Sequence, residues 1–256
     1  MKRYIKNMLL ASAAVMTLCG LSACIDETVP TDEATPATIK TDSKSLSYLA
    51  NSLPSFLTTW NTYNSGDYTQ DWGYPCQMYM RDLLCADFPQ SDNSFNYWDY
   101  IEDGSSLRYA YYYTFYYYYV FIKNANGVIS VGKDAVDGGN EAAKKYLGQG
   151  YGYRAMLYLD LERLFEYKKT GVSYLDKQAD SIGCMGITIP IVTEKTSKVE
   201  LKNNPCAPFY TMNRFIMTDL NRAEENLAGY NREHKAFMDQ SVIYGLKTRL
   251  WLDMAT

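Results

Sequence analysis

The sequence contains a single histidine, His234, among its 256 residues. Histidine is the side chain that most often binds transition metals and serves as a general base near neutral pH. One histidine excludes a metal site built on several imidazoles, and a Ser-His-Asp triad would depend on this side chain alone. Because His234 lies in a polar stretch, we interpret it as a solvated loop residue. We expect no enzyme activity, no catalytic residue, no metal and no cofactor.

Clusters of positive charge are also missing. Lys and Arg together number 25 against 29 Asp and Glu, and the formal net charge is −4. The basic residues are scattered, and no run exceeds two, as in Lys168-Lys169. Nucleic-acid binding requires a clustered basic face. The sequence therefore argues against a nucleic-acid partner.

An aliphatic run that could direct the chain to a membrane occurs only near the amino terminus, at residues 8–18. Basic residues precede it, and small residues then lead to Leu21-Ser22-Ala23-Cys24. This order is that of a secretory signal, and its end resembles the bacterial lipobox, whose cysteine is acylated and begins the mature protein. The alternative, a transmembrane helix over residues 8–25, is barely long enough to span. We expect Cys24 to be lipidated outside the cytoplasm.

The following stretch, residues 25–41, is polar, contains Pro30 and Pro36, and shows no apolar period. Such a composition predicts a flexible tether. From residue 43 onward the apolar spacing becomes helical. We therefore divide the chain into a signal peptide (1–23), a tether (24–42) and a helical domain (43–256).

Cysteines are few and form no C-x-x-C pair, which excludes the commonest zinc and thioredoxin-like motifs. Four lie beyond the lipobox, an even number that permits disulfides in an exported protein. Buried free thiols are an equally good interpretation. These four are Cys76, Cys85, Cys184 and Cys206.

Apolar side chains recur at three- and four-residue spacing along most of the domain. The pattern predicts an all-α, tetratricopeptide-like helical-repeat superhelix with long loops. Asn140 is a candidate N-cap, residues 61–75, 86–106 and 170–208 read as loops or irregular chain, and residues 186–193 read as extended. The expected helices are 43–60, 76–85, 107–131, 140–167, 209–227 and 241–256.

The last of these helices carries an apolar stripe formed by Val242, Leu246, Leu250 and Met254. The sequence offers no later helix to cover it. We expect this stripe to be uncovered and the fold to be truncated.

Tyrosine is abundant, with 25 residues, and residues 111–121 are almost entirely aromatic. That run has strand propensity, but it lies within a long unbroken segment, which favours a helix. A helix that is aromatic all round is expected to be buried on most sides.

Two glycine-rich stretches resemble nucleotide-binding motifs only in part. Residues 127–133 match most of a phosphate-binding loop, but Asp134 takes the place of the magnesium-binding Ser or Thr. Residues 148–152 are followed by Tyr153, at the position where a dinucleotide-binding fingerprint needs its third glycine. We interpret the latter glycines as sites of close helix packing.

Aromatic side chains in the loops of residues 61–100 are the candidate ligand site. Their rings lie among amides and carboxylates, and flat rings beside such groups suit sugars, whose faces are C–H and whose rims are hydroxyl. The alternative is that these rings plug the loops onto the core. We expect Trp98 to be the main stacking platform, helped by Tyr97 and Trp72, with Asn96, Asp99 and Arg81 as hydrogen-bond partners of the sugar hydroxyls.

Several motifs in a fixed order resemble the SusD/RagB family, the surface lipoproteins of Bacteroidetes nutrient-uptake systems. They are the lipobox, the tyrosine-rich helix and residues 146–165 (YLGQGYGYRAMLYLDLERLF). Residues 186–193 resemble the family's G-x-P turn, residues 219–227 its D-L-x-x-A helix, and residues 242–254 the helix after that. The resemblance covers residues 24–256 and corresponds to roughly the amino-terminal half of a typical member.

The resemblance implies an all-helical fold whose loops form a ligand site for oligosaccharides. It also implies a lipid-anchored position at the cell surface, on the outer membrane, and docking onto a SusC-like TonB-dependent transporter. Three alternatives stay open: a peptide-capturing member of the same family, a helical-repeat lipoprotein that binds only proteins, and a glycoside hydrolase.

Overall fold

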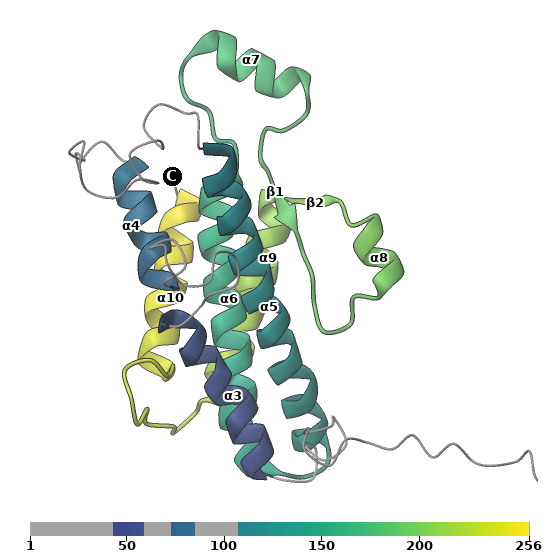
Figure 1. Cartoon of the computed structure of the whole chain (residues 1–256), viewed down its shortest axis with the longest axis vertical. Helices are drawn as coiled ribbons and strands as arrows, with labels where there is room; N and C mark the ends of the chain where they lie inside the picture. The colour runs from purple at the N-terminus through teal and green to yellow at the C-terminus, as the bar shows by residue number, and fades with distance from the viewer. Residues whose placement is uncertain (1–42, 59–72, 85–106, 256) are drawn as a thin grey trace, which may run out of the picture. The chain divides into compact units, whose positions relative to one another are not determined.

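The computed structural model describes residues 43–58, 73–84 and 107–255 (Figure 1). The chain divides into two compact units, Met1–Thr35 and Pro36–Thr256, and every described residue belongs to the second. The signal peptide, the tether and Cys24 lie outside the described residues, so what we expect of them stays a prediction. None of the described helices is long and apolar enough to cross a membrane.

Helices dominate the described part of the chain, which confirms the all-α fold class. Pro54 lies inside the first of them without ending it. The elements are α3 (Ser43–Thr58), α4 (Tyr74–Leu84), α5 (Leu107–Asp137), η3 (Glu141–Ala143), α6 (Lys144–Phe165), α7 (Ser173–Ser181), β1 (Ile187–Pro190), α8 (Lys198–Lys202), β2 (Cys206–Pro208), α9 (Phe209–Asn226) and α10 (Gln240–Ala255).

Helix α6 is the central helix of the fold. Helices α3, α5, α9 and α10 all pack against it, with α5 as its antiparallel neighbour (Figure 1). The side chains of Leu157, Leu159 and Leu161 have no exposed surface. Residues two apart point to opposite sides of a helix. Helix α6 is therefore buried on all sides, as a helix at the centre of a bundle must be.

Glycines let the neighbouring helices approach α6 closely. A Cβ built on Gly148 would lie 2.6 Å from Cγ of Leu227, and one on Gly150 would lie 2.8 Å from Cγ1 of Ile129. Carbon atoms in contact lie about 3.5–4.0 Å apart, so neither position accepts a larger residue without movement. The interpretation of residues 148–152 as packing glycines is confirmed. Residues 127–133 lie inside α5, where they cannot form a phosphate-binding loop.

The tyrosine-rich run is helical, as expected, and forms the first half of α5. The expectation that it is buried on most sides is only half right. Tyr117, Tyr118 and Phe121 are fully buried, whereas Tyr112 and Tyr116 are exposed. The helix packs on the core with one face only, because no described element covers the other.

The middle of the stripe on α10 is covered, which corrects the expectation that the stripe has no partner, whereas Met254 at its end is 37% exposed. Leu246 and Leu250 are buried, and α10 packs on α9 and α6. Outside the stripe, Trp251 and Leu252 are also exposed. The sequence pattern was read as needing a later helix, but the earlier helix α9 supplies the contact.

The chain between α6 and α9 is more ordered than the sequence indicates. It contains α7, α8 and the antiparallel pair β1 and β2, whose register joins Ile187 to Pro208 and Pro190 to Cys206. Helix α8 begins with a capping box, in which Ser197 and Glu200 each bond the other's backbone N–H. The extended stretch at residues 186–193 is confirmed. The short helices were missed because neither shows a full apolar stripe.

Two smaller expectations also have outcomes. Asn140 precedes the short helix η3, but its side chain forms no capping hydrogen bond. The N-cap prediction is therefore wrong in its chemistry. Cys184 and Cys206 are free thiols, Cys76 is buried on α4, and Cys85 lies outside the described residues.

Candidate functional site

Most of the side chains expected to bind a ligand lie outside the described residues. Arg81 is the exception, and it lies on α4. The roles expected of the others stay predictions. They are Trp72, Asn96, Tyr97, Trp98 and Asp99.

Arg81 lies beside a buried carboxylate that joins three helices to α6. Its Nη1 atom is 3.3 Å from Oδ1 of Asp160, and Arg249 of α10 donates to the same oxygen at 3.0 Å. The hydroxyl groups of Tyr74 and Tyr118 donate to Oδ2 at 2.6 and 3.3 Å. Burial, followed by the charge of Asp160, raises the pKa of Tyr74 above its ordinary value. The tyrosine therefore stays a proton donor, and Arg81 fixes α4 while remaining partly exposed.

An exposed aromatic surface runs along the first half of α5. We call the side chains of Tyr111, Tyr112, Phe115 and Tyr116 the aromatic face; each is more than a third exposed. The rings of Tyr112 and Tyr116 are nearly parallel, at 9° and 6.4 Å between centroids. Phe165 of α6 packs its ring edge-on against Phe115 at 5.7 Å. Grouped exposed rings of this kind are a typical binding surface.

The aromatic face was not predicted as a ligand surface, although the sequence contained a signal for it. Tyr112 and Tyr116 are four residues apart, so they lie on one side of a helix. The fully buried Tyr117 and Tyr118 follow directly. The one residue of the run that is neither aromatic nor aliphatic, Thr114, is buried. No polar residue therefore marks which side faces water, and the pattern alone did not separate the two faces.

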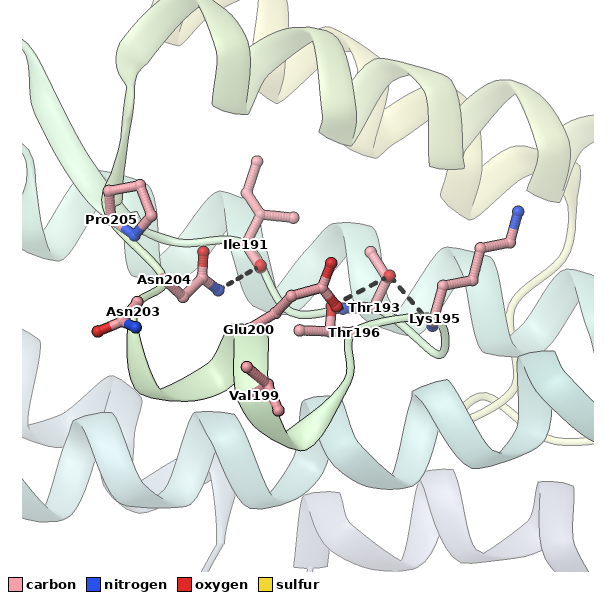
Figure 2. A pocket seen from close by; sticks show the side chains of 9 residues that line it. All are labelled: Ile191, Thr193, Lys195, Thr196, Val199, Glu200, Asn203, Asn204 and Pro205. Carbon is pink, nitrogen blue, oxygen red and sulfur yellow. Dashed lines mark hydrogen bonds between the residues drawn. The ribbon is translucent and has the colours of Figure 1, made fainter.

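A second surface feature is an open hollow of about 540 Å³ in the segment between β1 and β2 (Figure 2). Its wall mixes polar and apolar surface, and the amide of Asn204 donates to the carbonyl oxygen of Ile191 at 2.7 Å across one end. The sequence pointed to no site here. The lining residues are Ile191, Thr193, Lys195, Thr196, Val199, Glu200, Asn203, Asn204 and Pro205.

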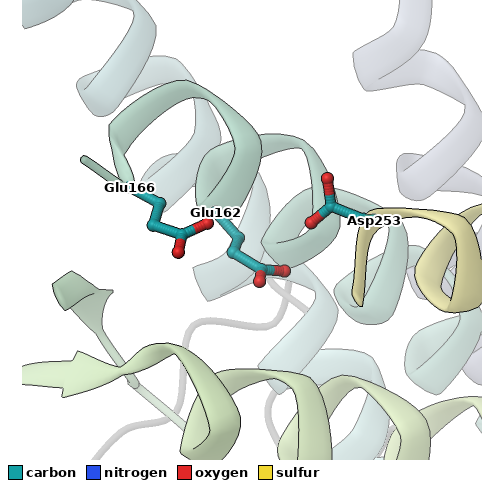
Figure 3. Close-up of side chains that lie close together, drawn as sticks. All are labelled: Glu162, Glu166 and Asp253. Carbon is teal, nitrogen blue, oxygen red and sulfur yellow. The ribbon is translucent and has the colours of Figure 1, made fainter. Parts of the chain in front are cut away.

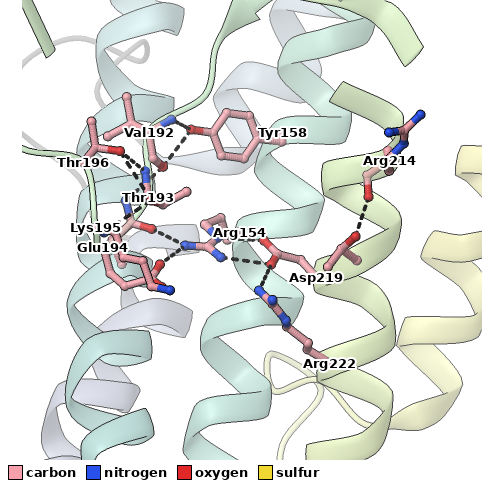
Figure 4. Close-up of polar contacts among 12 residues, drawn as sticks. Arg154, Tyr158, Val192, Thr193, Glu194, Lys195, Thr196, Arg214, Asp219 and Arg222 are labelled. Carbon is pink, nitrogen blue, oxygen red and sulfur yellow. Dashed lines mark hydrogen bonds and ion pairs between the residues drawn. The ribbon is translucent and has the colours of Figure 1, made fainter. Parts of the chain in front are cut away.

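One buried arginine, Arg154, holds the 190–194 segment, which contributes Ile191 and Thr193 to this hollow (Figure 4). Arg154 of α6 is 1% exposed and donates to Oδ2 and Oδ1 of Asp219 at 2.7 and 2.9 Å. Its Nη1 atom also donates to Asn126 and to Glu194, each at 2.7 Å. Burial alone would lower the pKa of Arg154, but the hydrogen bonds and charge of Asp219 outweigh it and raise the pKa. The guanidinium therefore stays charged and links α5, α6, α9 and the 190–194 segment.

The backbone of the 190–194 segment is held by further side chains of the core. Tyr158 donates its hydroxyl to the carbonyl oxygen of Val192 at 3.0 Å and accepts from the N–H of the same residue at 2.7 Å. Asn126 also donates to that carbonyl, at 3.1 Å. The hydroxyl of Tyr119 donates to Pro190. The wall of the hollow is thus fixed on rigid helices.

The interpretation of His234 as a solvated loop residue is confirmed. It is exposed in the chain between α9 and α10, and its Nδ1 atom accepts from the backbone N–H of Ala236 at 3.2 Å.

No protein-family model and no curated protein matches the chain. Among solved structures, it is similar to a SusD-like carbohydrate-binding protein from Bacteroides vulgatus, at 22% sequence identity and a TM-score of 0.63. That match covers 82% of this chain and 41% of that protein. A SusD-like carbohydrate-binding protein from Bacteroides fragilis matches at 12% identity and a TM-score of 0.52, covering 83% of this chain and 37% of that one. The chain thus spans about two fifths of the length of these proteins, and over that part it has the SusD-like fold.

Proposed function

We propose that this chain captures oligosaccharides at the cell surface, without enzyme activity, and delivers them to a TonB-dependent transporter in the outer membrane. The observation that best supports this is the fold shared with a solved protein described as carbohydrate-binding. The match concerns the fold, and the side chains at the surface support the ligand class.

The proposed binding surface combines the aromatic face with residues 85–106, which precede α5 in the sequence. Residues 85–106 lead directly into Leu107, the first residue of that helix. Trp98 is the proposed stacking platform in the loop, with Tyr97 and Trp72 as helpers. Aromatic rings offer a flat apolar surface to the C–H face of a sugar. Hydrogen bonds to sugar hydroxyls are assigned to Asn96, Asp99 and the exposed part of Arg81.

A peptide is the second candidate ligand. The hollow between β1 and β2 supports it, because Lys195, Glu200 and Asn203 offer a cation, a carboxylate and an amide at one site. Peptide backbones and termini require groups of all three kinds. A protein-only interaction is the remaining alternative, and the exposed Trp251 and Leu252 on α10 would be its surface.

The ligand class is tested by screening the purified full chain against a panel of polysaccharides and a panel of peptides. We expect retention on at least one glycan class, weakened by Tyr112→Ala in the aromatic face. Tyr210→Ala is the matched control, because Tyr210 is 73% exposed at the start of α9, outside this face. Binding to peptides alone would replace the glycan proposal with the second candidate.

The anchor and the partner need separate tests. Cys24→Ala should release the protein into the aqueous fraction, because the lipid is its proposed attachment; stable attachment takes more than one acyl chain. Mild detergent extraction of the tagged chain should co-purify a large outer-membrane transporter. A Cys24→Ala protein that stays in the membrane would refute the anchor, and repeated recovery of the chain alone would refute the partner.

A further inference from the structure

Three carboxylates meet at the carboxyl-terminal end of α6. Glu162 lies in the last turn of that helix, Glu166 caps it, and Asp253 comes from α10. One oxygen from each carboxylate lies within 4.8 Å of the other two, and Figure 3 shows the three side chains directed toward one another. Glu162 is fully buried, and the other two side chains are 7% exposed. Carboxylates this close repel one another unless positive charge lies between them.

The basic side chains nearby compensate this charge only in part. Lys168 lies 3.7 Å from Glu166 and 3.4 Å from Asp253, and Arg163 lies 3.5 Å from Asp253. Both basic side chains are at least 40% exposed. Among the described residues, no ion pair reaches Glu162. The most deeply buried carboxylate of the cluster is therefore the one that forms no ion pair among the described residues.

Buried oxygen atoms without a hydrogen-bond donor form a second, independent observation. Glu162 accepts one hydrogen bond on Oε1, from Asn213 Nδ2 at 2.7 Å, and its Oε2 atom has no donor. Asn213 itself is 2% exposed, and its side-chain oxygen, Oδ1, also has no hydrogen-bond donor. The Oε2 atom of Glu166 also has no hydrogen-bond donor, although the ammonium group of Lys168 lies 3.7 Å from it. Native proteins leave few buried polar atoms unpaired, and an ion is one of the usual reasons.

We propose that Glu162, Glu166 and Asp253 bind a divalent cation, Ca²⁺, with the side-chain oxygen Oδ1 of Asn213 as an additional ligand. All of these atoms are oxygens, the ligands that Ca²⁺ and Mg²⁺ prefer. Calcium accepts irregular geometry at about 2.3–2.6 Å, so oxygens on its opposite sides lie roughly 4.6–5.2 Å apart. Magnesium requires a tighter octahedron. Water completes the coordination.

The position in the fold also suits a cation. The carbonyl groups at the carboxyl-terminal end of a helix carry partial negative charge, and α6 ends at Phe165 between the two glutamates. A hollow of about 170 Å³ adjoins Asp253 and is lined by Arg163, Arg249 and Leu252 as well. The ion would join α6 to α10 directly and to α9 through Asn213. It would act as a structural cross-link, separate from the proposed glycan surface.

Thermal unfolding of the full chain tests the site. One sample contains 10 mM CaCl₂ and the other contains EDTA with NaCl added to equal ionic strength. Sites of this kind in extracellular proteins have dissociation constants of about 10⁻⁴–10⁻³ M. Binding of that strength should raise the unfolding temperature by about 3–10 °C. Titration calorimetry with CaCl₂ should show one site. Unfolding curves that coincide in CaCl₂ and EDTA would overturn the proposal.

Variants separate a calcium site from a structural acid cluster. Glu162→Gln removes a negative charge and a ligand while keeping the acceptor for Asn213. We expect it to lose the calcium-induced shift without lowering the unfolding temperature in EDTA. Glu225→Gln, an exposed acid on α9, should keep the full shift. If Glu162→Gln does not fold, Glu166→Gln serves as the test, and a full shift in the variant used would refute the assignment.

Discussion

The guanidinium of Arg154 donates two hydrogen bonds to the carboxylate of Asp219, from Nε at 2.7 Å and from Nη2 at 2.9 Å. Both side chains are almost completely buried. The rings of Phe215 and Tyr151 lie 5.2 and 5.5 Å from the guanidinium carbon. Charged groups are buried at a high cost unless they are paired and hydrogen-bonded. This pair joins α6 to α9 and holds the 190–194 segment through Glu194.

Breaking the pair should be strongly destabilising. Arg154→Met keeps most of the side-chain volume but leaves Asp219 buried without its partner. We expect the free energy of unfolding to fall by about 3–5 kcal/mol, measured by urea denaturation. Arg222→Ala is the control, because Arg222 is 49% exposed and lies 3.8 Å from the same carboxylate. It should cost about 1 kcal/mol or less, and equal losses in the two variants would contradict the account.

The bond to Glu194 should make part of the stability depend on pH. Partial burial would raise the pKa of Glu194, but the hydrogen bond and charge of Arg154 outweigh it and lower the pKa below its ordinary value near 4.5. A lowered pKa in the folded state contributes stability above about pH 4.5, which is lost as the pH falls through that lowered pKa.

The measurement compares the wild-type protein with Glu194→Gln from pH 7 to pH 3. At pH 7 the wild type should be more stable by about 1 kcal/mol, and the difference should shrink toward zero in acid. Glu225→Gln should show no such trend, since Glu225 is exposed. A difference that grows on acidification has the wrong sign for this ion pair.

Two helical glycines should respond in opposite directions to the same substitution. At Gly150 in α6 a new Cβ would meet Ile129 at 2.8 Å, whereas at Gly127 in α5 nothing lies within 4 Å. Gly150→Ala should therefore lower the free energy of unfolding by about 1–3 kcal/mol. Gly127→Ala should raise it by about 0.5–1 kcal/mol, because alanine favours the helix. Urea denaturation measures both, and stabilisation by Gly150→Ala would refute the close packing.

Local patterns predicted much of the fold. The stripe on α9, including Met212, Ile216 and Leu220, is buried as its spacing indicates. The extent of α5 was underestimated, because the sequence segment was ended at residue 131 and the helix continues to Asp137. Helix α7 has little apolar surface to reveal it.

Polar groups inside the core were the least predictable part. Asp160 and Asp253 look like solvated charges in the sequence, because their partners lie up to 90 residues away. The cluster of Glu162, Glu166 and Asp253 was not predictable for the same reason. Only the packing of α10 on α6 brings the carboxylate of Asp253 close to the two glutamates. Arg154 is buried by the whole bundle. Long-range packing decides these sites, and periodicity carries no information about it.

Isothermal titration of the full chain with its best glycan tests the central claim most directly. Stacking on an aromatic ring contributes about 1–3 kcal/mol in comparable contacts, so Trp98→Ala should weaken binding roughly tenfold or more, with the fold intact by circular dichroism. Tyr210→Ala should leave the affinity unchanged. Measurable glycan binding that Trp98→Ala reduces is the predicted result. Binding of no glycan class by the folded wild-type protein, or the same affinity in Trp98→Ala, would contradict the account.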